Sequence, residues 1–184
     1  MRKKLIAGNW KMYKTLAPAR ELVGGIVAGL PRIGTLDHVE ILICPPVQLL
    51  FPMAKAVADT PIKLGAQNAH SEIQGAFTGE VSVPMLADTG CTHVIIGHSE
   101  RRQIFHEDNA LLARKVRAVV AGGLQVVYCV GETLAQREAG QMQSVIQSQL
   151  SEVLNLEVSP DRLIVAYEPV WAIGTGKTAT PQLA

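Results

Sequence analysis

Six short apolar runs recur along the chain, and each predicts a buried strand. Their residues are mostly Val, Ile, Leu and Ala in unbroken succession, a pattern typical of parallel strands that are covered on both faces. The runs occupy residues 5–10, 39–44, 62–67, 93–97, 124–130 and 163–167. The hydrophobic pattern therefore predicts a parallel sheet.

Apolar residues between the runs recur at helical spacing. Leu22, Ile26 and Leu30 form one such face, and similar faces lie at residues 49–57, 83–87, 110–120 and 134–154, the last predicted as a single helix. Strands that alternate with helices indicate an α/β fold, and we expect one domain spanning residues 1–184. An open doubly wound sheet and a (β/α)8 barrel both fit the pattern, and both place the ligand site at the carboxyl ends of the strands.

Composition narrows the class of protein further. The chain has 184 residues, of which 48% are hydrophobic. Its formal charge is only +1, so the protein has no strong electrostatic field that would favour nonspecific binding to nucleic acid or to an anionic membrane. The three cysteines are odd in number and widely spaced, which argues for reduced thiols and against a disulfide framework or a metal site. The chain shows neither a signal segment nor a membrane-spanning run, so we expect a soluble cytoplasmic protein.

Polar residues follow the predicted strands. Because the carboxyl ends of parallel strands meet at one rim, we expect these side chains to lie close together. A cation, an amide, an imidazole and a carboxylate in one cleft would form a proton-transfer site with an anion clamp. Each residue also has an ordinary structural explanation when taken alone. The residues are Asn9, Lys11, Gln67, Asn68, His98, Glu100, Glu132 and Glu168.

His98 differs from the other four histidines in its setting. It precedes a predicted helix with Ser99 as the expected N-cap and Glu100 in the first turn. The positive end of a helix disfavours a protonated imidazole, so we expect His98 to be a neutral hydrogen-bond donor.

The segment after the last predicted strand has the features of a base with a lid. Glu168 ends the apolar run, Pro169 stops the strand, and large apolar residues precede two glycines. A solvated carboxylate at an ordinary strand end is the alternative. The glycines do not form a nucleotide-binding P-loop, because that pattern requires glycine where Trp171 stands.

Six motifs make the chain resemble the triosephosphate isomerase family along essentially its whole length. They are AGNWKM at 7–12, GAQN at 65–68, GAFTGE at 75–80, GHSERR at 97–102, CVGE at 129–132 and YEPVWAIGTG at 167–176. The resemblance implies a (β/α)8 TIM barrel of which this chain supplies the first six β/α units. It also implies a homodimer that needs no cofactor and no metal and that interconverts dihydroxyacetone phosphate and glyceraldehyde 3-phosphate.

The resemblance also implies catalytic roles for named residues. Glu168 would be the base that moves a proton between neighbouring carbons, and His98 would polarise the carbonyl. Lys11 and Asn9 would bind the anionic substrate, and Glu100 would fix Lys11.

Two loops receive roles from the same resemblance. The segment from Pro169 to Ala179 would be a lid that excludes water. The loop around Phe77 and Thr78 would insert into a partner subunit. Within the lid, Gly174 would offer its N–H to the phosphate and Gly176 would add flexibility, while the apolar residues that keep water out are Val170, Trp171 and Ile173.

The length of the chain departs from the barrel pattern. A (β/α)8 barrel typically has about 250 residues, so strands seven and eight are not among the 184 residues. We expect that the natural polypeptide continues past Ala184 and that a chain ending there would fold poorly and be almost inactive. A non-catalytic barrel fragment that serves as an assembly module is the alternative function.

Overall fold

The computed structural model describes residues 3–156 and 158–172, and all structural statements below concern these residues. The chain divides into two compact units, Met1–Val94 and Ile95–Ala184, and each is described by itself. None of the described helices is long and apolar enough to cross a membrane.

The first unit contains parallel strands joined by helices. The strands pair in chain order, with Lys4 opposite Val39, Ile41 opposite Ile62 and Gly65 opposite His93. Parallel neighbours need crossover connections, which the helices provide. The elements are β1 (Lys4–Asn9), α1 (Leu16–Gly29), η1 (Leu30–Ile33), β2 (Val39–Cys44), η2 (Val47–Leu49), α2 (Leu50–Val57), β3 (Ile62–Ala66), α3 (Val83–Asp88) and the start of β4 (His93–Ile96).

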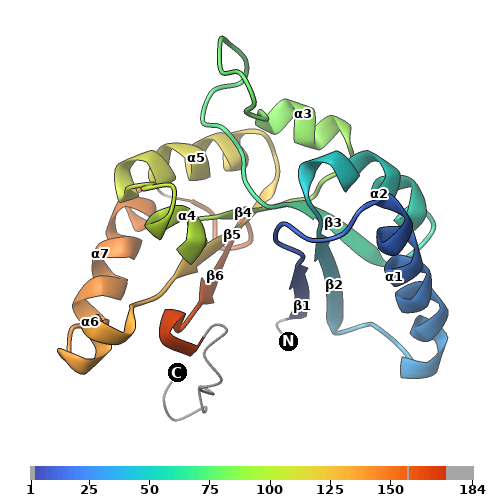
Figure 1. The fold of residues 1–184 in the computed structure, drawn as a ribbon, viewed down its shortest axis with the longest axis horizontal. Coiled ribbons are helices and arrows are strands. Elements are labelled where there is room, and N and C mark those ends of the chain that lie inside the picture. Colours follow the sequence, from blue (N-terminus) through green and yellow to red (C-terminus); the bar gives the residue numbers. More distant parts are fainter. Residues whose placement is uncertain (1–2, 157, 173–184) are drawn as a thin grey trace. The chain divides into compact units, whose positions relative to one another are not determined.

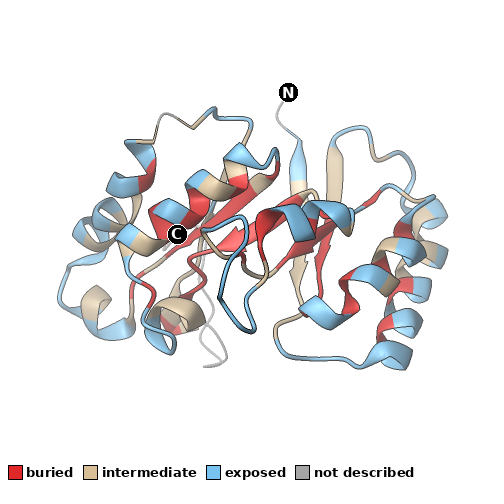
Figure 2. Ribbon diagram, turned by 90° about the horizontal axis from the view of Figure 1, so that it is seen from above, coloured by how far each residue is buried: buried red, intermediate tan, exposed pale blue. Residues whose placement is uncertain are grey.

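The core of the first unit lies between its strands and the inner faces of α1 and α2. These helices lie side by side, and α2 packs against β3 (Figure 1). Figure 2 shows the buried stripe on each helix facing the strands, with the outer faces exposed. Val23, Met53 and Leu64 are buried in this layer, and removal of such side chains from water is the main stabilising contribution.

The second unit repeats the strand and helix pattern. β5 and β6 pair in parallel, with Val126 opposite Leu163 and Val130 opposite Tyr167. Helix α5 packs against β5 and α7 through buried side chains that include Leu112 and Val116. The elements after β4 are α4 (Ser99–Gln103), α5 (Asn109–Ala121), β5 (Gln125–Val130), α6 (Leu134–Glu138), α7 (Met142–Leu154), β6 (Leu163–Tyr167) and η3 (Val170–Ala172).

The single helix expected over residues 134–154 is wrong, because the structure has two helices there. Helix α6 begins with a capping box in which Thr133 and Gln136 satisfy each other's backbone N–H groups. It ends before Gly140, whose φ of 69° is readily adopted only by glycine. The apolar residues continue at helical spacing across this break, so periodicity alone did not reveal it.

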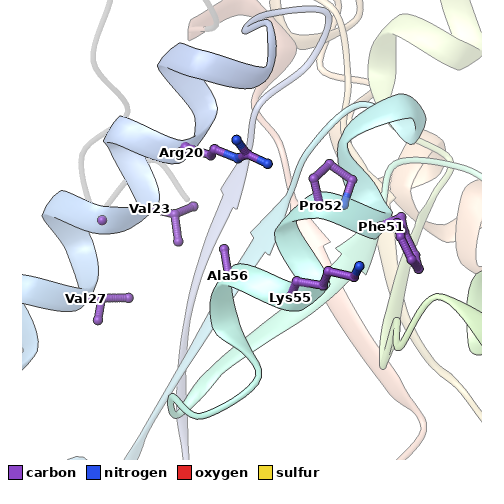
Figure 3. Close-up of a pocket in the computed structure, with 8 residues that line it drawn as sticks. Arg20, Val23, Val27, Phe51, Pro52, Lys55 and Ala56 are labelled. Carbon is purple, nitrogen blue, oxygen red and sulfur yellow. The ribbon is translucent and has the colours of Figure 1, made fainter.

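A shallow hollow of about 490 Å³ lies between α1 and α2 on the surface of the first unit (Figure 3). Val23, Val27 and Ala56 line its apolar part. Arg20 and Lys55 border it, and the Lys55 ammonium lies 4.5 Å from the centre of the Phe51 ring. None of the site residues expected from the sequence lines this hollow.

Candidate active site

The carboxylate of Glu168 lies directly after β6, as the sequence predicted. Its backbone N–H donates to the carbonyl of Val130 across 2.7 Å and extends the β5–β6 pairing by one residue. The side chain is only 21% exposed. Its Oε2 accepts from the backbone N–H of Ser99 at 3.3 Å, and its Oε1 lies 3.3 Å from Nε2 of His98. The ordinary solvated carboxylate is therefore not what the structure shows.

His98 is itself the N-cap of α4, so the expectation that Ser99 would cap this helix is wrong. The Nδ1 atom accepts from the backbone N–H of Glu100 at 3.2 Å. Nδ1 also lies 3.5 Å from Oε2 of Glu100, while the other ring nitrogen, Nε2, faces Glu168. A carboxylate and an imidazole nitrogen thus face each other in the second unit.

Glu132, expected among the polar side chains of the rim, is instead completely buried. It accepts from Arg137 Nη1 at 3.0 Å, from Trp171 Nε1 at 2.9 Å and from the Tyr167 hydroxyl at 3.0 Å. Burial opposes ionisation of this carboxyl, but these hydrogen bonds outweigh it and hold its pKa below the ordinary value. Glu132 therefore anchors the segment that follows β6.

Glu132 holds the first part of the segment that was expected to form the lid. Pro169, Val170 and Trp171 are described, and Trp171 is buried with its indole held by Glu132 and its ring 5.0 Å from the Arg137 guanidinium. Ile173, Gly174 and Gly176 lie outside the described residues. Sequence reasoning missed Arg137 and Tyr167, because nothing in their spacing indicates a common partner.

In the first unit, Asn9 is the last residue of β1 and Lys11 follows it by two residues. The Asn9 side chain accepts from the backbone N–H of Lys11 at 3.0 Å, and Lys11 has a φ of 51°, which is uncommon for a residue with a Cβ. The amide nitrogen of Gln67 donates to the carbonyls of Lys11 and Cys44, each at 2.9 Å. Backbone strain of this kind costs about 1–3 kcal/mol and persists where neighbouring groups enforce it.

The long loop before α3 is ordered by its own side chains. It forms a projection between β3 and α3 (Figure 1). The rings of His70 and Phe77 stack with centroids 4.1 Å apart, and Phe77 is 43% exposed. Thr78 lies beside it, also exposed. An exposed aromatic residue on an ordered loop fits a contact surface.

Cys44, Cys91 and Cys129 are all buried. Burial, together with the nearby Cys91, raises the pKa of Cys44 to about 12. Among the described residues, no group of three or more His, Cys, Asp or Glu side chains could hold a metal ion.

Comparison with known proteins shows the family of the chain. The family model described as Triosephosphate isomerase matches residues 4–184. The chain belongs to the triosephosphate isomerase family. Proteins named triosephosphate isomerase are similar along nearly the whole chain: one from Chloroflexus aurantiacus is 55% identical over 98% of this chain and 72% of its own length. Those from Roseiflexus sp. and Rhodopirellula baltica are 52% and 49% identical and are covered over 71% and 72% of their lengths.

Membership of the triosephosphate isomerase family decides the fold class that the sequence left open. The described strands are those of a (β/α)8 TIM barrel, of which this chain supplies the first six β/α units, and an open doubly wound sheet is excluded. The relatives are isomerases by name.

Proposed function

We propose that this protein interconverts dihydroxyacetone phosphate and D-glyceraldehyde 3-phosphate through an enediolate. The observation that carries the proposal is the 3.3 Å separation of Glu168 Oε1 and His98 Nε2, within a chain of the triosephosphate isomerase family. A base and a neutral hydrogen-bond donor at that separation can act on neighbouring carbon and oxygen atoms of one small substrate.

Glu168 is the proposed base. Its carboxylate takes the proton from C1 of the ketose, while the Nε2–H of His98 donates to the carbonyl oxygen at C2, and an enediolate forms. The proton then returns from Glu168 to C2, and His98 moves a proton between the two oxygens. The reaction is a proton shift within one molecule and needs neither an oxidant nor a cofactor.

Lys11 and Asn9 are the proposed anion-binding residues. The Lys11 ammonium would neutralise the phosphate and the charge that develops on the enediolate, and Asn9 would donate to a substrate oxygen. The strained backbone of Lys11 supports this role, because such strain is concentrated at functional sites. Glu100 is proposed to fix the Lys11 side chain.

The segment that begins at Pro169 is proposed to close over the substrate. Gly174 would donate to the phosphate, and Gly176 would let the segment bend. Exclusion of water by Val170, Trp171 and Ile173 matters because a wet enediolate can expel its phosphate. The anchoring of Trp171 by the buried Glu132 supports a hinge at this end.

The loop that carries Phe77 and Thr78 is proposed to dock into a second copy of the chain, giving a homodimer. The odd number and wide spacing of the three cysteines support a reducing, cytoplasmic location. Sedimentation of the purified protein tests the dimer, because a monomeric species at assay concentration would contradict it.

Substitution of Glu168 by Gln tests the proposed reaction. The glutamine has the same shape and can still accept from Ser99, but it cannot take a proton. We expect kcat to fall about 10²- to 10⁴-fold, with the circular dichroism spectrum unchanged. Glu152→Gln, at an exposed position on α7, is the control.

Two readouts complete this test. Exchange of substrate hydrogen with solvent deuterium should be lost with Glu168→Gln, because the base mediates that exchange. Wild-type protein that folds and self-associates but neither isomerises nor exchanges the substrate would support the assembly module instead.

A further inference from the structure

Gln149, on helix α7, forms a two-point contact with the backbone at the end of β5. Its Oε1 accepts from the N–H of Gly131 at 2.8 Å, and its Nε2 donates to the carbonyl of the same residue at 3.0 Å. Both polar ends of the side chain are therefore used on one residue. This pairing also determines which end of the amide is oxygen and which is nitrogen.

Gly131 lies one residue past the end of β5, where the strand ladder no longer supplies its partners. The last hydrogen bond of the β5–β6 pairing runs from the Glu168 N–H to the Val130 carbonyl, at 2.7 Å. Gly131 is half-buried, and backbone groups shielded from water past the end of a ladder need another partner. The Gln149 side chain provides one for the N–H and one for the carbonyl.

The backbone of Glu168 packs directly against Gly131. A Cβ built at position 131 would overlap the carbonyl oxygen and carbon of Glu168, so only a glycine leaves room for this contact. A shift of Gly131 would therefore be transmitted to the backbone that carries the Glu168 carboxylate.

Helix α7 does not depend on this side chain for its position. The Tyr128 hydroxyl donates to the backbone carbonyl of Gln149 at 2.8 Å, and the Asn109 amide donates to the carbonyl of Ser148 at 3.1 Å. The buried Val153 adds an apolar contact from the same helix. Loss of the Gln149 amide should consequently leave α7 in place and release only Gly131.

We propose that Gln149 is a positioning residue for the catalytic carboxylate. Gln149 fixes the position of Gly131, and Gly131 contacts the backbone of Glu168. Gln149 thereby fixes the distance of the Glu168 carboxylate from His98. This inference rests on the proposed function for its catalytic meaning. Its structural content, the coupling from Gln149 through Gly131 to Glu168, can be tested without activity.

Gln149→Met is the decisive variant, since methionine has similar volume but cannot pair with Gly131. Gln147→Met, at an exposed position on the same helix, is the matched control. We expect Gln149→Met to lower kcat about 10- to 100-fold with KM for the triose phosphate nearly unchanged, because a displaced base slows chemistry without removing phosphate contacts. The control should match wild type in both constants.

In Gln149→Glu, low pH should restore the pairing with Gly131. The ionised carboxylate repels the Gly131 carbonyl, whereas the protonated acid has one donor and one acceptor and reproduces the amide. The ratio of the variant's kcat to that of wild type should therefore rise as the pH is lowered from about 8 toward 5, across the range above the ordinary glutamic acid pKa of about 4.3.

Hydrogen exchange tests the positioning role of Gln149 separately from the proposed isomerase function. In Gln149→Met, the amide hydrogens of Gly131 and Glu168 should exchange at least about 10-fold faster while those of the α7 interior keep their protection. Unchanged exchange at Glu168, or an unchanged kcat in an active wild-type background, would overturn the positioning role. Inactive wild-type protein would refute the proposed function alone, since the exchange result stands without it.

Discussion

The indole N–H of Trp171 donates to Glu132 across 2.9 Å and ties the segment after β6 to the end of β5. The contact joins two residues far apart in sequence within the second unit. It leaves a buried carboxylate with donors from a tryptophan, a tyrosine and an arginine.

Trp171→Phe removes this donor and keeps most of the apolar volume. Hydrogen bonds to charged groups contribute about 1.5–3 kcal/mol, and we expect the free energy of unfolding to fall by that amount. Urea denaturation followed by circular dichroism measures it. An unchanged urea midpoint would show that the indole contact contributes nothing to stability.

The stability contributed by Glu132 should depend on pH. Its pKa is lower in the folded chain than the ordinary value of 4.5, so the folded state favours the ionised form. The contribution is then complete above pH 4.5 and is lost as the pH falls through the lower, folded-state pKa. The urea midpoint of wild type should exceed that of Glu132→Gln at neutral pH, and the gap should narrow in acid. A constant gap would contradict an ionised Glu132.

Gly131→Ala tests the close approach to the Glu168 backbone. The added methyl group overlaps the Glu168 carbonyl, and overpacking of this kind costs about 1–3 kcal/mol. We expect lower thermal stability together with reduced kcat.

Gly24→Ala is the control for that prediction. Gly24 lies in α1 with nothing within 4 Å of the position that an added methyl group would occupy, so alanine should raise stability by about 0.5–1 kcal/mol. Calorimetry of both variants should show shifts of opposite sign.

Gln67→Met removes two hydrogen bonds that hold the carbonyls of Lys11 and Cys44. At about 0.5–1.5 kcal/mol each, their loss should lower the free energy of unfolding and let Lys11 relax from its positive φ. Because Lys11 is proposed to bind the phosphate, KM should rise more than kcat falls. Gln125→Met removes one exposed contact, to the Asp161 carbonyl, and should leave KM unchanged.

Cys44 should resist thiol reagents in the folded protein. It is fully buried, and its pKa of about 12 leaves almost no thiolate near neutral pH. Labelling followed by mass spectrometry should find Cys44 unmodified in buffer and all three cysteines modified in urea. Rapid labelling of Cys44 in buffer would indicate local opening around β2.

Features of the fold could be predicted where the residues of a single stretch of chain are enough to indicate them. The apolar runs predicted the bounds of every strand to within a residue at either end. The expectation that every strand is buried is wrong for β1 and β6, whose residues are all half-buried or exposed. The same reasoning placed Glu168 directly after β6 and His98 just beyond β4, from which Gly97 separates it. Two further expectations were wrong. The N-cap of α4 is His98 and not Ser99, and the helix expected over residues 134–154 is interrupted by a left-handed turn at Gly140.

By itself, the sequence determined the order of strands and helices, the residues at the strand ends and, through its motifs, the family. Only the tertiary structure decided that Glu132 is a buried anchor, that Gln67 holds Lys11, and that Gln149 pairs with Gly131. The physical reason is the range of the interactions. Apolar periodicity is a property of neighbouring residues, whereas a hydrogen bond between a side chain and a distant backbone depends on how separate elements pack.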